Sequence, residues 1–303
     1  MKKVWGHLLI SMTMVFFGGP LSSAEGLSKK NIDLTFEQAK GGDAEAQNIV
    51  GLFYLTTQDY VEALKWFEKS AAQGNSSAQL GIGALYIGGL GVDQDYSKAH
   101  EWYEKSAVKG NKIAQMRLGS LYFSGLGVRQ DYVKAREWFE QSASQEDSSA
   151  QVMLGFLYYQ GLGVRQNYVK AREWFEKAAA HGEISAQTGL GVLYVSGLGV
   201  RQDYAKAREW FEKSAVHGDK LAQSQLGFLY FEGLGVPQNY AKAYDWYKKA
   251  ADQGEPGAQV GLGILYYEGH VVRQDYVKAK EWFGRACDEG FQLGCDEYKK
   301  LNK

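Results

Sequence analysis

Apolar residues along most of the chain recur at the 3.6-residue spacing of helices rather than in the alternation typical of strands. In residues 112–147, Leu118, Leu121 and Tyr122 lie on one predicted helical face. A second apolar face follows, and its members are Tyr132, Ala135, Trp138, Phe139, Ser142 and Ala143. Charged residues such as Lys134 and Glu137 occupy the opposite side of this second segment. The block therefore predicts two amphipathic helices.

The stretch between the two predicted helices has the composition of a tight connection. Residues 125–130 read Gly-Leu-Gly-Val-Arg-Gln, which predicts a chain reversal. Asp131 follows as a candidate N-cap, because its carboxylate can accept from the free N–H groups of the first turn. Gly119 lies within the first helix, where a neighbouring helix can approach closely. Each block is therefore predicted to be a helix hairpin.

The block repeats with a period of 36 residues, which decides the organisation of the whole chain. Tryptophan marks the period at Trp66, Trp102, Trp138, Trp174, Trp210, Trp246 and Trp282. An Ala-Gln pair marks it again at 78–79, 114–115, 150–151, 186–187, 222–223 and 258–259. A hairpin of this kind buries its apolar face only by stacking on its neighbours. The sequence therefore predicts an all-α solenoid.

Six full repeats are predicted over 76–291, preceded by a shorter repeat at 44–75. This first repeat lacks four loop residues, since the residues at 55–58 replace the glycine-rich turn. Residues 25–43 are expected to form an N-terminal cap segment, and 292–303 a C-terminal cap helix. With 37 glycines and only three prolines, the composition fits helices that end at glycine.

The repeated motif resembles the Sel-1-like repeat family, whose members are relatives of the tetratricopeptide repeats with a longer loop. The residues that carry the resemblance are the Leu-Gly-x-Leu-Tyr-x-x-Gly-Leu-Gly-Val run at 118–128 and the Asp-Tyr-x-Lys-Ala-x-x-Trp run at 131–138. The resemblance covers about residues 44–300, and the last full repeat departs from it at 270–272. It implies a right-handed α/α superhelical solenoid with a concave groove, and an adaptor or scaffold role in signalling or envelope biology.

The first residues have the order of a secretory signal peptide. Lys2 and Lys3 precede an apolar run over 4–17, and small residues lead to a cleavage site after Ala24. An uncleaved membrane anchor is the alternative. We expect a signal peptide at 1–24 and an exported protein, periplasmic or secreted, with no membrane span once the signal is removed.

The net charge and the motifs of the sequence argue against several classes of function. The net charge of −1, with alternating signs along the repeats, argues against a nucleic-acid partner. His181 and His217 occupy equivalent positions about 10 Å apart, given the usual spacing of packed helices, which is too far for one metal ion. Neither a phosphate-binding loop nor a His-Glu-x-x-His motif occurs in the sequence. We expect no metal, no cofactor and no enzymatic activity.

One catalytic pattern remains as an alternative. Ser106 and Lys109 fit the S-x-x-K motif of penicillin-recognising enzymes, and secreted cysteine-rich relatives within the family are often labelled β-lactamases. The positions equivalent to Ser106 in other repeats hold serine or alanine, which indicates a slot for a small packed residue. A β-lactam-binding hydrolase is therefore the second hypothesis.

Two surface features are candidate partner sites. Arg129, Arg165, Arg201 and Arg273 could form a stripe for an acidic partner, although a solvated and locally paired loop surface is the simpler interpretation. The resemblance to tetratricopeptide proteins implies that a second face of the first helices lines a groove. That face comprises Ile113, Met116 and Phe123; Val152, Phe156 and Tyr159; Leu221, Phe228 and Phe231; and Val260, Ile264 and Tyr267. The alternative is that these residues pack between repeats. We expect a monomer that binds a protein or peptide there.

Cys287 and Cys295 are the two cysteines of the chain. A short turn at Gly290 should bring the helices that carry them together, and an exported pair in an oxidising compartment favours a disulfide. Paired cysteines eight residues apart also resemble those of the secreted, cysteine-rich members of the family. Two buried free thiols are the alternative.

Overall fold

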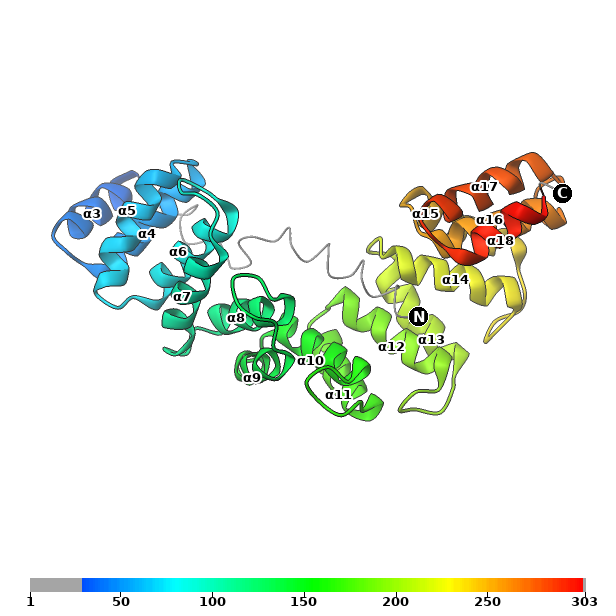
Figure 1. Ribbon diagram of the computed structural model, residues 1–303, viewed down its shortest axis with the longest axis horizontal. Coiled ribbons are helices and arrows are strands. Elements are labelled where there is room, and N and C mark those ends of the chain that lie inside the picture. The colour runs from blue at the N-terminus through cyan, green and yellow to red at the C-terminus, as the bar shows by residue number, and fades with distance from the viewer. Residues whose placement is uncertain (1–28, 302–303) are drawn as a thin grey trace. The chain divides into compact units, whose positions relative to one another are not determined.

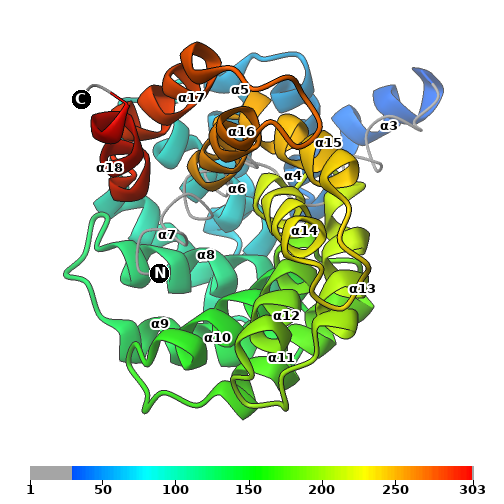
Figure 2. The ribbon, with the colours of Figure 1, turned by 90° about the vertical axis from the view of Figure 1, so that its right-hand side faces the viewer.

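The computed structural model describes residues 29–301, which form sixteen helices and no strand (Figures 1 and 2). The chain divides into two compact units, Met1–Gln166 and Asn167–Lys303. Helices α3 to α10 belong to the first unit and α11 to α18 to the second. Within each unit, consecutive helices pack against each other, as the order of labels in the two views shows. The predicted all-α solenoid of helix hairpins is confirmed.

Every hairpin has a first and a second helix of similar length. The first helices are α4 (Ala44–Thr56), α6 (Ser76–Gly88), α8 (Lys112–Ser124), α10 (Ser148–Gln160), α12 (Ile184–Ser196), α14 (Lys220–Glu232) and α16 (Pro256–Glu268). The second helices are α5 (Tyr60–Ala72), α7 (Tyr96–Ala107), α9 (Tyr132–Ala143), α11 (Tyr168–Ala180), α13 (Tyr204–Ala215), α15 (Tyr240–Asp252) and α17 (Tyr276–Asp288). Helix α3 (Lys29–Lys40) precedes them, and α18 (Gln292–Lys300) follows them. The proposed signal peptide at 1–24 lies outside the described residues.

The ends of the helices follow from the residues at the loop. Gly125 ends α8 in the left-handed conformation, with φ at 73°, and its N–H donates to the carbonyl of Leu121 at 2.8 Å. Asp131 then caps α9, and its Oδ1 accepts from the backbone N–H groups of Val133 and Lys134 at 3.0 Å each. The predicted capping role of Asp131 is confirmed. The short first repeat replaces this loop with a tighter connection, in which Gln58 takes a φ of 61°.

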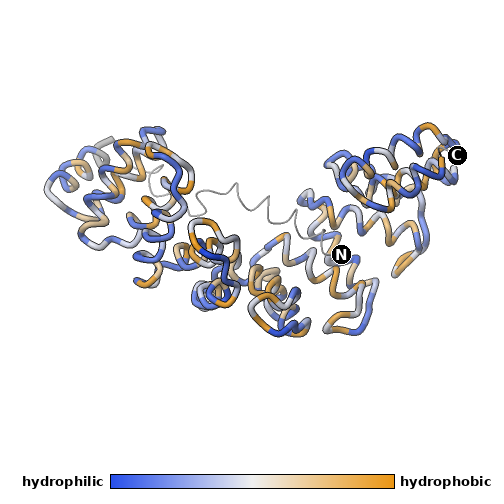
Figure 3. Tube along the Cα trace, viewed as in Figure 1, coloured by the Kyte–Doolittle hydropathy of each residue, from blue (hydrophilic) through white to orange (hydrophobic). Residues whose placement is uncertain are grey.

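Within each unit, aromatic rings of second helices lie directly against glycines of first helices. A methyl group added to Gly119 would come within 2.7 Å of the Phe139 ring, and one on Gly191 within 2.5 Å of Phe211. Both rings are fully buried. Hydrophobic and hydrophilic residues are interspersed along the helices (Figure 3). Glycine is needed at these positions because any side chain would collide with the ring.

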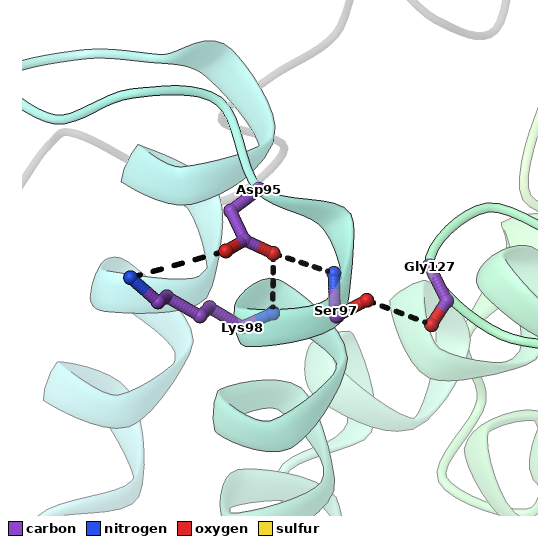
Figure 4. A network of polar contacts seen from close by, with 4 residues as sticks. All are labelled: Asp95, Ser97, Lys98 and Gly127. Carbon is purple, nitrogen blue, oxygen red and sulfur yellow. Dashed lines mark hydrogen bonds and ion pairs between the residues drawn. The ribbon is translucent and has the colours of Figure 1, made fainter.

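Where the full glycine-rich loop is present, it also contacts the second helix of the repeat before it. Gly127 has a φ of 70°, and a Cβ there would lie 2.3 Å from the carbonyl carbon of Tyr96 at the start of α7. In Figure 4 the Ser97 hydroxyl donates to the Gly127 carbonyl at 3.1 Å, beside the Asp95 cap of α7. The loop can approach this closely because glycine has no side chain.

The recurrent glutamine makes a second bond between neighbouring repeats. The Nε2 of Gln115 donates to the Ala107 carbonyl at 3.1 Å, and Gln223 donates to Ala215 at the same distance. Both glutamines are buried, so the bond satisfies polar groups that have left water. The sequence showed the recurrence of this residue but not its partner.

Candidate protein-interaction surface

The predicted groove residues, which we call the first-helix face, differ widely in exposure. Phe123, Val152 and Tyr159 are buried, as are Leu221 and Val260. Those that are half-buried are Ile113, Met116, Phe156, Phe231 and Ile264. Phe228 and Tyr267 are exposed, at 40% and 45% of their surface. The buried members are held by packing, so the accessible aromatic surface of this face lies on α14 and α16 of the second unit.

An aromatic contact within the hairpin recurs along the first-helix face. The ring of Phe123 lies 5.3 Å, centroid to centroid, from that of Tyr132, which begins the second helix of its own hairpin. Phe231 makes the equivalent contact with Tyr240 at 5.3 Å. Tyr267 contacts Tyr276 at 5.3 Å in the same edge-to-face arrangement. These ring pairs stabilise the hairpin, although Phe123 is buried and Tyr267 is exposed.

The Sel1 repeat profile matches residues 44–75, 76–111, 112–147, 148–183, 184–219, 220–255 and 256–291. The chain belongs to the Sel1 repeat family. These seven Sel1 repeats have the same boundaries as the units set by the sequence period, including the short first one. Proteins of the family are commonly interaction scaffolds and typically lack catalytic activity, which fits the helical repeat fold.

Two solved Sel1 repeat structures are similar over most of the chain. A protective antigen of uropathogenic Escherichia coli with an SLR fold matches 89% of the chain at 36% identity and a TM-score of 0.80. The chain spans 59% of the length of that protein. A Sel1 repeat protein from Oxalobacter formigenes matches 79% of the chain and 96% of its own length, at 32% identity and a TM-score of 0.73. Comparison with curated proteins gives no match.

The Ser-x-x-Lys pattern is part of the packing of the Sel1 repeats. Ser106 is fully buried, and its hydroxyl donates to the carbonyl of Ser76 at 2.7 Å. Lys109 is exposed, and its Nζ donates to the Gly74 carbonyl at 2.6 Å. Ser70 and Ser142 make the same bond as Ser106, to Ala44 and Lys112. This arrangement gives no support to a serine nucleophile activated by lysine.

The arginines of the loops are exposed, as expected, but their local pairing is not observed. Within residues 29–301, the ion pairs do not include Arg129, Arg165, Arg201 or Arg273. Three capping aspartates instead pair weakly with a lysine in the first turn, as Asp95 does with Lys98 at 3.9 Å. Helical spacing of three residues brings these two side chains together.

The histidines and acidic residues that the structure describes do not converge on a metal site. His181 and His217 are both exposed. Over the described part of the chain, no group of three or more His, Cys, Asp or Glu side chains could hold a metal ion. None of the helices described is long and apolar enough to cross a membrane.

The last Sel1 repeat is closed by a disulfide. The sulfur atoms of Cys287 and Cys295 are bonded at 1.96 Å, and they join α17 to α18. Gly294 of α18 lies against α17, and a methyl group added to it would lie 2.6 Å from the Cβ of Ala286. The disulfide that the sequence suggested is therefore present in the structure.

Proposed function

We propose that the chain is a protein-interaction scaffold that binds a segment of a partner protein on its first-helix face and catalyses no reaction. The observation that carries the proposal is the exposure of Phe228 and Tyr267 on α14 and α16, two first helices in direct contact. Exposed aromatic residues on adjacent helices are typical of protein-binding sites, where such residues often contribute most of the binding energy. Stacked first helices also present a continuous surface for an extended ligand.

The proposal is restricted to the accessible residues of the first-helix face. Phe228 and Tyr267 can contact a partner without rearrangement, and the half-buried Phe231 and Ile264 can contribute their exposed edges. Phe123, Val152 and Tyr159 are buried, so their role in binding would be to hold the helices in place. This division differs from a groove lined equally by all the predicted residues.

We also propose that the protein is exported and acts in the periplasm or outside the cell. The disulfide supports this, because such bonds persist in oxidising compartments. The bacterial origin of the similar Sel1 repeat structures is compatible with it. The leader sequence predicts cleavage after Ala24. Mass analysis of the mature protein should therefore find Glu25 at its N-terminus, and a chain that still begins with Met1 would contradict export with cleavage.

The test of binding compares two double variants in partner capture. Purified protein with a cross-linker would capture its partner from the native envelope fraction, and Phe228→Ser with Tyr267→Ser should abolish most of that capture. The matched control is Val133→Ser with Val169→Ser, which removes apolar side chains of similar exposure, 46% and 45%, from second helices. Circular dichroism should show the same helical content for both. Equal capture by the two variants would contradict the proposal.

A further inference from the structure

Three residues of one helical face recur on both α14 and α16. Phe228, Phe231 and Glu232 are spaced i, i+3 and i+4 along α14, and Ile264, Tyr267 and Glu268 have the same spacing on α16. Residues with this spacing lie on one side of a helix. Because α14 and α16 are in contact, the six side chains belong to one surface of the second unit, which we call the acidic aromatic face.

The carboxylates distinguish this face from the other repeats. The residues equivalent to Glu232 and Glu268 are Gly88, Ser124, Gln160 and Ser196, none of which is charged. Glu232 is exposed, and its carboxylate has no ion-pair partner among the described residues. Glu268 contacts His270, with 2.9 Å between its Oε2 and the imidazole Nε2. The cation beside Tyr267, Lys300, is already paired with Glu297 at 2.6 Å.

We infer that the acidic aromatic face recognises a partner segment in which apolar residues are flanked by lysine or arginine. The inference rests on the proposed function and specifies the chemistry of its ligand. Exposed Phe228 and Tyr267 would cover the apolar residues, and the two carboxylates would face the flanking cations. Complementary charge of this kind selects among partners with similar apolar residues, and salt weakens the selection.

The test uses three fluorescein-labelled peptides and fluorescence polarisation with the full mature chain. The first is Lys-Lys-Leu-Phe-Leu-Lys-Lys, the second replaces each lysine with glutamate, and the third replaces the apolar centre with three serines. The wild-type protein should bind the first at least about tenfold more tightly than either of the others. The preference over the acidic peptide should shrink as salt is raised from low to high concentration.

A charge reversal makes the test specific for this face. Glu232→Lys with Glu268→Lys should lose the basic peptide and gain the acidic one, a change of about tenfold or more in each direction. The matched control is Glu173→Lys with Glu209→Lys, which changes the net charge equally through exposed residues of second helices in the same unit. This control should keep the wild-type preference. Thermal unfolding of all three proteins verifies that each is folded.

Failure of this inference can be told apart from failure of the proposed function. Equal binding of basic and acidic peptides, or an unchanged preference after charge reversal, would overturn the inference. Suppose that Phe228→Ser with Tyr267→Ser still abolished capture of the native partner. The scaffold role would then be supported, and only the preference for a basic partner segment would be wrong. If Phe228→Ser with Tyr267→Ser captured the partner as well as the wild type does, the proposed function and the further inference would both be wrong.

Discussion

Cys295 is bonded to Cys287 at the pair of positions where several earlier repeats place a glutamine and the carbonyl that it contacts. Gln223 donates to Ala215 across the same separation of eight residues, and Gln115 donates to Ala107. At the last junction a covalent bond thus replaces a hydrogen bond. The disulfide therefore fastens α18 at a contact that the fold already uses.

Reduction should loosen α18 while leaving the other helices intact. A loop this short limits the contribution of the disulfide to about 2 to 3 kcal/mol. Hydrogen exchange within Gln292–Lys300 should accelerate on reduction, with little change in α4 to α9. Cys287→Ala with Cys295→Gln should restore the glutamine bond, recover about 1 kcal/mol and make the protein insensitive to reductant. Two free thiols in protein isolated without reductant would contradict the account.

The glycine beneath each buried ring should tolerate no side chain. Gly191→Ala would press a methyl group against Phe211 and should lower the free energy of unfolding by about 1 to 3 kcal/mol. Gly257→Ala is the matched control, because its nearest neighbour is the movable Ser224 hydroxyl at 3.3 Å. It should be close to neutral or slightly stabilising, since alanine favours helix. Equal loss of stability in both variants, measured by urea unfolding, would refute the explanation.

Ser106 should prove structural rather than catalytic. Ser106→Ala removes the hydrogen bond to the Ser76 carbonyl and should destabilise the protein by about 0.5 to 1.5 kcal/mol. Ala178, Ala250 and Ala286 occupy the equivalent position in other repeats, so alanine fits there. Hydrolysis of a chromogenic β-lactam should stay at background for both proteins. Turnover by the wild type that disappears in the variant would restore the hydrolase hypothesis.

Two buried tyrosines should make the protein lose stability in alkali. Burial raises the pKa of Tyr103 to about 12 and raises the pKa of Tyr247 as well. Since an unfolded tyrosine ionises near pH 10, the stability from the neutral buried form is complete below pH 10 and is lost as pH rises toward 12. The loss should reach about 2 to 3 kcal/mol for Tyr103.

Phenylalanine stands at the corresponding position of other repeats, which provides the control for the alkaline effect. Tyr103→Phe should fold normally and should reduce the decrease in the urea midpoint between pH 9 and pH 11.5. An identical decrease in the wild type and the variant would show that ionisation of Tyr103 is not involved.

The sequence predicted the hairpins because each depends on residues within one repeat. The cap at Asp131 and the close approach at Gly119 are both local consequences of residue type and spacing. Exposure of the first-helix face was not predictable in this way. Tyr159 and Tyr267 are identical residues at equivalent positions, yet 8% of one and 45% of the other is exposed. Their neighbours in adjacent helices make the difference, and the repeat period does not encode them.

The sequence predicted the Cys287–Cys295 disulfide, but not that it replaces the contact of the recurrent glutamine. Aligning the C-terminal segment with the full repeats places Cys295 at the glutamine position and Cys287 at an alanine position. That register shows that Cys295 takes the place of the recurrent glutamine, but it does not show which residue the glutamine contacts. The partner of the glutamine itself is a backbone carbonyl, which leaves no signal in residue identity.

Site-specific photo-crosslinking in the native compartment tests the interaction surface most directly. A photoreactive phenylalanine analogue at Phe228 should give a discrete adduct with a partner protein, and the same analogue at Tyr267 should give an adduct of the same size. The analogue at the equally exposed Val133, on a second helix, should give none. Adducts from Val133 alone, or no adduct from Phe228 and Tyr267, would contradict binding on the first-helix face.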